Sequence, residues 1–437
     1  MKIITKLRSL HLKGIKNIDD GKIEFYNNNG YLNVTGIYGQ NGSGKTSVVL
    51  ALGFIKMLLL GREMTETDRE LFGSKDKASI VVEFEHPGHC IIKYSIEFSR
   101  KEGNLFVIES ESISRSVKRW FTLVEYNRGS STIFEETIHQ FTGKSSYAII
   151  EKNAIEHGTS IVFNEIYKDF LFQEKSVKFE HIKEIYSICQ KFAFNLLIVN
   201  NRANAMVQMS EVLPMSIAFQ QVVLGFLPMN ISGEEIFFPA KFKDYYIKVI
   251  EQINIVLPAL IPGLRLELLE RRRQLTSAGD GEEITTELVA NREGHRFPFR
   301  AESDGIKKLV GILSYIIYVY NNEEVILVVD ELDAGIFEYL LGELIQIISE
   351  SAKGQLVFTS HNLRVLEVLD FKKIVLTTTN PENRYIRLKQ IKTTNNVRDV
   401  YLRTIIVGGA QEELYQETRS SDIKRAIRKA GRLNEKE

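Results

Sequence analysis

The most constraining feature of the sequence is the loop from Gly39 to Thr46, which reads Gly-Gln-Asn-Gly-Ser-Gly-Lys-Thr. It has the form G-x-x-x-x-G-K-[ST], in which the glycines let successive backbone N–H groups turn toward the phosphates of a nucleotide. Residues 31–38 have the apolar pattern of a strand, and residues 46–60 have that of a helix. Because phosphates bind where a glycine-rich loop opens a helix, this context favours a nucleotide site over a chance match. The residues predicted to hold the phosphates are Gly39, Gln40, Asn41, Gly42, Ser43, Gly44, Lys45 and Thr46.

The composition is balanced rather than basic or acidic. The chain has 56 Lys and Arg residues and 56 Asp and Glu residues, so its net charge favours neither nucleic acid nor acidic membranes as a partner. Its two cysteines, Cys90 and Cys189, are far apart and form no metal-type cluster, which is typical of a reducing compartment. The sequence has no apolar run of membrane-spanning length and no signal-peptide pattern. We therefore expect a cytoplasmic protein without a membrane partner, whose 437 residues form two or three lobes.

After the P-loop helix, the sequence pattern changes twice. Four short segments rich in β-branched and aromatic residues alternate with turns, which predicts an antiparallel meander. These segments are 80–85, 91–99, 105–113 and 121–127. From about residue 145 to residue 262, apolar residues recur at helical spacing, and prolines interrupt them. We therefore predict an N-terminal part at 1–144, an inserted, mainly helical lobe at 145–262 and a C-terminal part at 263–437.

A second apolar strand ends in two acidic residues. The consecutive apolar residues 325–329 predict a strand that is buried on both faces in the middle of a parallel sheet. Asp330 and Glu331 follow at its carboxyl end, where α/β sheets bind ligands. A buried carboxylate is costly without a cation, and Mg²⁺ is a suitable one. We therefore predict that Asp330 and the Thr46 hydroxyl hold Mg²⁺, while Lys45 reaches the β- and γ-phosphates.

Four further features carry polar or basic side chains. His361 follows the next apolar strand, 355–359, and we predict a role for it at the γ-phosphate. Ser303 precedes an amphipathic helix and occupies the position of an N-cap. The basic run 271–273 is interpreted as a solvated strand end in preference to a nucleic-acid contact. The basic helix at 423–432 is either a docked surface helix or one that binds a partner or phosphates.

The order of these features resembles a known family. Lys45 and Asp330 are much farther apart than one βαβ unit would place them, so whole lobes are inserted between two halves of one site. The P-loop, meander, helical lobe, Ser-x-Gly helix, Asp-Glu strand and Ser-His pair follow the order found in ATP-binding-cassette (ABC) ATPase heads. The chain is most similar to the branch with structural-maintenance-of-chromosomes (SMC) and RecF-type proteins. Within it, the chain resembles stand-alone AAA-type ATPases of bacterial anti-phage systems, such as the ATPase subunits of PARIS, Septu and AbiL, and the ATPase half of overcoming-lysogenization-defect nucleases.

The resemblance implies a fold and a set of residue roles. The fold is α/β: a P-loop NTPase of ABC-ATPase head type, with an antiparallel β meander and an inserted, mainly helical lobe. Residues 39–46 match Walker A, Asp330 matches the magnesium residue of Walker B, and Glu331 matches the residue that polarises the attacking water. His361 matches the switch histidine. The remaining matches are Ser303 and Gly305 at the signature position and Lys16 and Asn17 in the loop that lies near the nucleotide.

The signature departs from that of the family's transporter members. Residues 302–306 read Glu-Ser-Asp-Gly-Ile and not Leu-Ser-Gly-Gly-Gln, which argues against a transporter. This departure leaves open whether Lys307 or Lys308 also contacts phosphate. The cofactors that the resemblance implies are ATP and Mg²⁺. The assembly that it implies is a homo-oligomer, either a head-to-tail dimer or a ring of dimers around ATP.

Two functions of different classes fit these features. The first is a defence ATPase that converts ATP and water to ADP and phosphate and controls a separate effector, such as a nuclease or toxin. The second is a RecF- or SMC-like ATPase that acts directly on DNA in repair or chromosome maintenance. The residues after His361 contain no Asp-x-Asp and no His/Cys cluster, so nuclease activity requires another chain. Direct work on DNA predicts a continuous basic surface, which the neutral composition does not supply. We therefore favour the first function and keep nucleic acid as a candidate partner.

Overall fold

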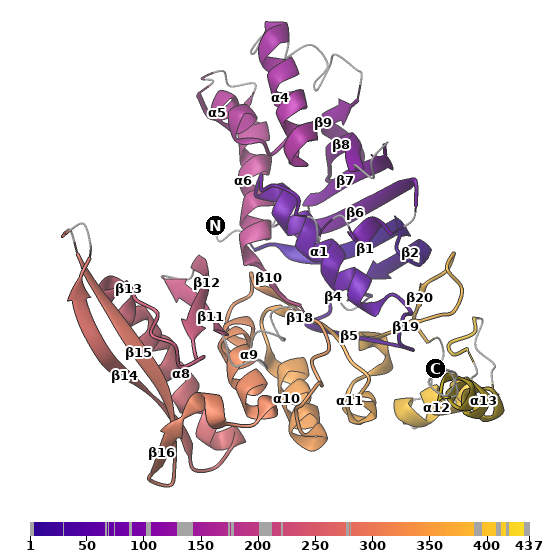
Figure 1. Ribbon diagram of the computed structural model, residues 1–437. Helices are drawn as coiled ribbons and strands as arrows, with labels where there is room; N and C mark the ends of the chain where they lie inside the picture. The colour runs from indigo at the N-terminus through magenta and orange to yellow at the C-terminus, as the bar shows by residue number, and fades with distance from the viewer. Residues whose placement is uncertain are drawn as a thin grey trace.

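The computed structural model describes residues 4–28, 30–65, 68, 70–73, 75–86, 90–101, 106–128, 143–173, 175, 179–200, 212–219, 222–276, 279, 281–388, 396–407, 412–416 and 419–431. Every predicted site residue lies within these ranges. Two six-stranded sheets, one mostly parallel and one antiparallel, share a hydrophobic core with helix α1 (Lys45–Leu59) (Figure 1). No helix in these ranges is both long and apolar enough to cross a membrane.

The central sheet is mostly parallel and carries the P-loop. Its strand order is β10-β17-β18-β5-β19-β20, and only β20 runs antiparallel to its neighbour. Its strands are β10 (Leu196–Val199), β17 (Ile326–Val329), β18 (Gln355–Thr359), β5 (Val34–Tyr38), β19 (Ile374–Thr377) and β20 (Tyr385–Ile386). All four residues of β17 are buried inside the sheet, which confirms the strand predicted at 325–329. Ile326 and Val328 pack toward α1, whereas Leu327 and Val329 pack toward the opposite face, as the period of two requires.

The second sheet is antiparallel and contains the predicted meander. Its strand order is β2-β1-β6-β7-β8-β9, so the chain's first two strands extend the meander. Its strands are β1 (Lys6–Ile15), β2 (Ile18–Glu24), β6 (Lys77–His86), β7 (Cys90–Arg100), β8 (Phe106–Ser116) and β9 (Trp120–Asn127). Alternate residues of β6 are buried, because one face of the sheet covers the core. A short pair, β3 (Tyr26–Asn27) and β4 (Gly30–Tyr31), leads from β2 to β5.

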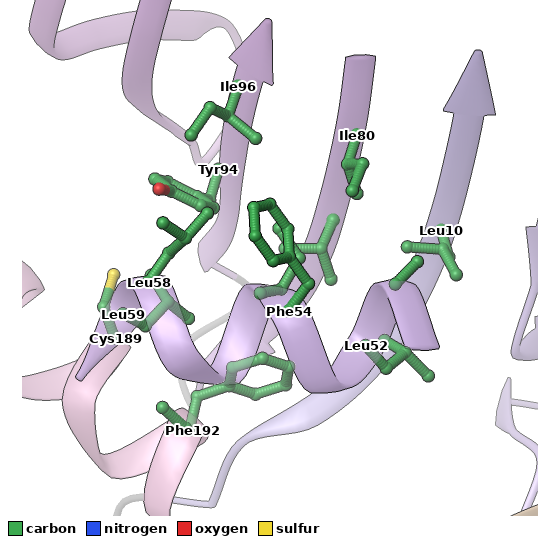
Figure 2. Close-up of a cluster of buried hydrophobic side chains, with 14 of the residues drawn as sticks. Leu10, Leu52, Phe54, Leu58, Leu59, Ile80, Tyr94, Ile96, Cys189 and Phe192 are labelled. Carbon is green, nitrogen blue, oxygen red and sulfur yellow. The ribbon is translucent and has the colours of Figure 1, made fainter. Parts of the chain in front are cut away.

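Helix α1 begins directly after the P-loop and is buried over most of its length. Figure 2 shows its side chains, Phe54 and Leu58 among them, facing the antiparallel sheet, while Phe192 of α6 (Glu180–Asn195) approaches from the other side. The ring of Phe54 lies 5.4 Å from that of Phe98, and Phe192 stacks on Phe84 at 4.1 Å. Full burial of such a side chain stabilises a fold by roughly 1.5–3 kcal/mol. The position of the P-loop is therefore fixed by the core of the protein.

Three helices cover the opposite face of the parallel sheet. They are α9 (Asp304–Asn321), α10 (Glu338–Ser351) and α11 (Leu363–Val368), and their apolar residues join one core cluster with the sheet. Ser303 caps α9, because its hydroxyl accepts a hydrogen bond from the backbone N–H of Ile306 at 3.4 Å. This confirms the predicted N-cap. Together with the meander, this arrangement matches the predicted P-loop NTPase of ABC-ATPase head type.

The segment at 145–262 contains both helices and strands. Its helices are α4 (Gly143–His157), α5 (Glu165–Gln173), α6 and α8 (Lys243–Leu260), and its strands are β10, β11 (Val212–Phe219), β12 (Val222–Asn230) and β13 (Phe238–Pro239). Four consecutive apolar residues form β10, which pairs with β17 in parallel and so belongs to the central sheet. The segment therefore contributes one strand to the central sheet, and its other elements lie outside that sheet. The division into three parts at 144 and 262 stays a proposal.

The remaining elements lie at the two edges of the molecule in Figure 1. They are β14 (Leu264–Leu275), β15 (Glu282–Arg292) and β16 (His295–Pro298) on one side, and α12 (Val397–Val407) and α13 (Ser420–Gly431) on the other. The three arginines at 271–273 on β14 each pair with a glutamate, which supports the interpretation of this run as a solvated strand end. The basic helix α13 has no buried residue.

A buried carboxylate ties the segment after α4 to the antiparallel sheet. Glu111 of β8 is fully buried and accepts hydrogen bonds from the hydroxyls of Tyr94, at 2.7 Å, and Ser160. It also accepts from the backbone N–H groups of Ile161, at 2.9 Å, and Val162, at 3.3 Å. Burial raises the pKa of Glu111, and these hydrogen bonds oppose the rise. One side chain thus holds residues 160–162 in place.

We expect Glu111→Ala to lower the free energy of unfolding by about 3 kcal/mol or more, because several buried donors lose their acceptor. The single tryptophan, Trp120, lies on β9 of the same sheet and reports its unfolding by fluorescence in urea. The matched control is Glu109→Ala on the same strand. Glu109 is one-third exposed and pairs with Lys101 and Arg128 at the surface, so its loss should cost at most about 1 kcal/mol. Equal losses for the two variants would contradict the role given to Glu111.

Candidate functional site

The P-loop joins the end of β5 to the start of α1, as the sequence predicts. Its first glycine is required by close packing: a Cβ on Gly39 would lie 1.6 Å from the hydroxyl oxygen of Thr377 on β19. Gly39 also has a φ of 155°, and Gly44, which precedes α1, has a φ of 94°. L side chains rarely adopt such values, so the motif's glycines permit this turn. The loop therefore forms a cradle, and side chains at the positions of its glycines would fill that space.

Lys45 is buried within this cradle. Its ammonium group donates hydrogen bonds to the carbonyl oxygens of Gly39, at 2.8 Å, and Gln40, at 3.0 Å. Burial lowers the pKa of Lys45, and the carboxylates of Asp330 and Glu331 oppose the shift. The lysine head is thus held between the P-loop carbonyls and the acidic end of β17, where an anionic phosphate would find a cation.

Neighbouring elements support the P-loop from outside. The buried hydroxyl of Tyr385 on β20 donates to the carbonyl of Gly44 at 2.8 Å. The Ser43 hydroxyl lies 2.5 Å from that of Thr377. The side-chain amide of Asn17 donates to the carbonyl of Gly42, so the loop between β1 and β2 reaches the P-loop. These contacts fix the loop's outer edge.

The other residues predicted around the P-loop have different neighbours. The backbone N–H of Lys16 bonds to the carbonyl of Leu71 at 3.2 Å, and Lys16 has a φ of 49°. Its link to the P-loop runs through Asn17. The side-chain oxygen of Gln40 accepts from the backbone N–H of Gln416 at 3.0 Å, which attaches the C-terminal segment to the loop.

Asp330 lies at the centre of the site and is fully buried. Its Oδ1 accepts hydrogen bonds from the hydroxyls of Thr359, at 2.7 Å, and Thr46, at 3.3 Å. Burial raises the pKa of Asp330, while these two hydroxyls and the charge of Lys45 act in the opposite direction. The structure thus brings the two predicted magnesium residues together. A carboxylate and a hydroxyl oxygen are ligands of the hard type that Mg²⁺ prefers, so this donor set fits the ion.

Glu331 has an unusual backbone conformation. Its φ is 48°, in the left-handed region that L residues seldom occupy. Its backbone N–H donates to the Thr359 hydroxyl at 2.7 Å, and its carbonyl accepts a hydrogen bond from the ammonium of Lys308. Such strained residues persist where the surroundings hold them, and they cluster at functional sites. One hydroxyl, that of Thr359, therefore contacts both Asp330 and Glu331.

His361 lies just past the carboxyl end of β18, beside the end of β17. The residue is partly open to solvent, and its backbone N–H donates to Oδ2 of Asp333 at 3.0 Å. Partial burial lowers the pKa of His361, and the charge of Lys45 lowers it further. A neutral imidazole near the P-loop lysine is suited to accept or pass on a hydrogen bond.

Ser303 and Gly305 lie beside the turn that follows Glu331. A Cβ on Gly305 would lie 2.0 Å from the carbonyl oxygen of Gly335, so only glycine allows α9 to pack so closely on that turn. Across the ranges that the structure describes, no hydrogen bond joins Ser303 or Gly305 to residues 39–46. The signature residues thus begin a helix that packs on the acidic turn.

Sequence reasoning missed several residues that hold the site together. Thr359, Thr377 and Tyr385 contact Asp330, Ser43 and the Gly44 carbonyl, respectively. Thr359 and Thr377 are polar residues at the ends of buried parallel strands, which is the signal that pointed to Asp330 and Glu331. Tyr385 belongs to a two-residue strand and gave no such signal.

A comparison with protein-family models finds one family that spans these residues. Residues 34–367 match the family described as "AAA domain, putative AbiEii toxin, Type IV TA system", a range that covers more than half of the chain and contains the P-loop, Asp330 and His361. No curated protein matches the sequence. Among solved structures, an Smc head domain with an extended coiled coil, bound to the C-terminal domain of ScpA and derived from Pyrococcus furiosus, is 14% identical with a TM-score of 0.44, covering 88% of this chain and 97% of that one. The SMC head domain from Thermotoga maritima is 16% identical with a TM-score of 0.39, covering 88% of this chain and 100% of that one. On the family match, the chain belongs to the AAA-domain family whose description names a putative AbiEii toxin of a type IV toxin–antitoxin system.

Proposed function

We propose that this protein binds ATP with Mg²⁺ and hydrolyses it to ADP and phosphate. The observation that carries the proposal is the contact between Thr46 and Asp330. Their oxygen atoms lie 3.3 Å apart although the residues are 284 positions apart in the sequence. This contact supports the proposal, because it brings a carboxylate from a distant segment to the P-loop.

The residues divide the work of phosphoryl transfer, which relies on positioning and on charge stabilisation. The backbone of residues 39–46 and the Lys45 ammonium bind and orient the phosphates. Thr46 and Asp330 would hold Mg²⁺, which neutralises charge on the phosphates when bound. Glu331 orients water toward the γ-phosphate, and His361 lies where it would hydrogen-bond near that phosphate. Asn17 and Lys16 line the loop beside the nucleotide.

Glu331→Gln should keep ATP binding but lower turnover about 100-fold or more, because the amide cannot accept a proton from the attacking water. Lys45→Ala should weaken nucleotide binding itself, since it removes the phosphate's cation. Binding would be measured with a fluorescent ATP analogue and turnover by phosphate release. Glu343→Gln, an exposed glutamate on α10, is the control and should match the wild type. An unchanged turnover number for Glu331→Gln removes Glu331 from this role.

We further propose that two copies share their sites, as a head-to-tail dimer or a ring of dimers. Two observations support this assembly. Ser303 caps the first turn of α9, where backbone N–H groups are available to an anion. In the described residues, neither Ser303 nor Gly305 is hydrogen-bonded to the chain's own P-loop. Under two-fold symmetry, each chain would give its P-loop to one site and its Ser303 to the other.

Mixing two inactive variants tests the shared site. Lys45→Ala and Ser303→Arg should each abolish turnover alone. If the sites are shared, a mixed dimer has one doubly damaged site and one wild-type site, so part of the ATPase activity returns on mixing. If each site lies within one chain, mixing restores nothing. Because strict coupling between sites could suppress the rescue, crosslinking of a photoreactive ATP between subunits is measured in parallel. If mixing gives no rescue and no crosslink forms between subunits, the shared site is contradicted.

We propose that ATP turnover controls a separate effector, a nuclease or toxin, in bacterial anti-phage defence. Support comes from the family description, which names a toxin–antitoxin system, and from the lack of a nuclease pattern after His361 in the sequence. The alternative is a RecF- or SMC-like ATPase that acts directly on DNA. One observation favours that alternative: α13 exposes Lys424, Arg425, Arg428 and Lys429 along its length.

The two functions predict different behaviour of the isolated protein. Under the effector proposal, the purified protein hydrolyses ATP slowly and cuts neither DNA nor RNA in Mg²⁺. A second protein should co-purify from the native source and be identified by mass spectrometry. Under the alternative, DNA should stimulate turnover, and Lys424→Glu with Arg428→Glu should abolish the stimulation. Magnesium-dependent nuclease activity that is lost on mutating this chain would contradict the effector proposal.

A further inference from the structure

Lys308, near the start of α9, is a buried cation. Only 2% of the residue is exposed, and its ammonium donates a hydrogen bond to the backbone carbonyl of Glu331. Burial lowers the pKa of Lys308 to about 8, and the carboxylates of Asp333, Glu331 and Asp330 act against this shift. A lysine in an apolar environment needs such partners to stay charged. The acidic turn after β17 thus keeps a cation at this place.

The neighbouring lysine on the same helix has a different partner. The ammonium of Lys307 lies 2.8 Å from Oδ1 of Asp304, in the first turn of α9. Both lysines are therefore engaged within the chain. Lys307 is also buried and is paired with the exposed Asp304, whereas Lys308 is bonded to the acidic turn.

Glu331 is held from two sides. Its backbone N–H is bonded to the hydroxyl of Thr359 on β18, and its carbonyl is bonded to Lys308 on α9. Between these two bonds, the residue keeps its φ of 48°. Because an L residue leaves this region readily when nothing holds it, each bond contributes to the direction in which the Glu331 side chain leaves the backbone.

The start of α9 also packs directly on the same turn. Gly305 lies so close to the carbonyl of Gly335 that a single Cβ would clash. Lys308 follows Gly305 by one helical turn. The signature residues, the turn 333–335 and Glu331 are therefore joined by one packing contact and one charged hydrogen bond.

We propose that Lys308 is a positioning residue that holds Glu331 in its hydrolytic conformation and links it to the signature end of α9. The inference rests on the proposed ATPase function. It gives Lys308 no contact with ATP, so its loss should affect the chemical step and leave nucleotide binding unchanged. It also joins the chain's own Glu331 to the helix that would contact the second copy's nucleotide.

The test compares Lys308→Met with the wild type in steady-state ATPase assays. We expect kcat to fall about tenfold or more, because a charged hydrogen bond to the Glu331 carbonyl is lost, with KM and the Kd for ATP unchanged. Lys308→Gln keeps a donor without the charge and should show an intermediate kcat. If Lys308→Met does not fold, Lys308→Gln carries the comparison.

Lys56→Met is the matched control. Lys56 is a partly buried lysine on α1, whose ammonium donates to a backbone carbonyl, that of Leu196, at 2.7 Å. Burial lowers its pKa to about 8 as well. Its replacement should lower Tm as Lys308→Met does but leave kcat unchanged. An equal fall in kcat for the two variants would mean that Lys308 is merely structural and would overturn the proposal.

A double variant separates positioning from other effects. In a Glu331→Gln background, Lys308→Met should lower kcat no further, because its effect runs through Glu331. A full additional tenfold loss there would overturn the proposal. If the wild type hydrolyses ATP and both Lys308→Met and Lys308→Gln have the same kcat as the wild type, this inference alone is overturned. A wild-type protein that binds ATP but does not hydrolyse it would overturn the proposed function and this inference with it.

Discussion

The pairing of β5 with strands from the far end of the chain is the constraint on which the site depends. Residues 34–37 hydrogen-bond in parallel to residues 356–359 on one side, and residues 36–38 pair with 374–376 on the other. This register places the start of the P-loop beside Thr359 and Thr377, since all these strands end at the same edge of the sheet. Without it, the glycine-rich loop would have no Asp330 within reach. The proposed nucleotide site is therefore a product of tertiary pairing between distant segments.

The buried charged groups at this edge of the sheet compensate one another. Asp330, Lys45 and Lys308 are all buried, and an isolated buried charge would cost several kcal/mol. Asp330 opposes the lowering of the pKa that burial imposes on both lysines, and Lys45 opposes the raising of the pKa of Asp330. The hydroxyls of Thr46 and Thr359 add neutral donors to the Asp330 carboxylate. The cluster is thus held by several moderate interactions. An anionic ligand that binds together with a cation would add charges of both signs, so neither the positive nor the negative charge of the cluster would be left without a partner.

The sequence allowed the motifs and the strands that carry them to be predicted, because their signals are local. A glycine pattern between a strand and a helix marks the P-loop, and two carboxylates after an apolar run mark the end of β17. The roles of Thr377 and Tyr385 could not be predicted, because each is an ordinary residue whose meaning comes from the strand beside it. Strand β10 was missed for a related reason. Its four apolar residues directly follow α6, and only pairing with β17 distinguishes them from another helical turn.

The strained backbone of Glu331 is held by two hydrogen bonds from different elements. A left-handed conformation costs an L residue roughly 1–2 kcal/mol, and a hydrogen bond from a charged donor contributes about 1.5–3 kcal/mol. The bonds from Lys308 and to Thr359 are therefore sufficient to hold Glu331, but removal of one of them leaves little margin. Because one bond comes from the central sheet and the other from α9, the conformation of Glu331 depends on how the sheet and that helix sit against each other. A shift of the start of α9 would therefore also change the forces that hold Glu331.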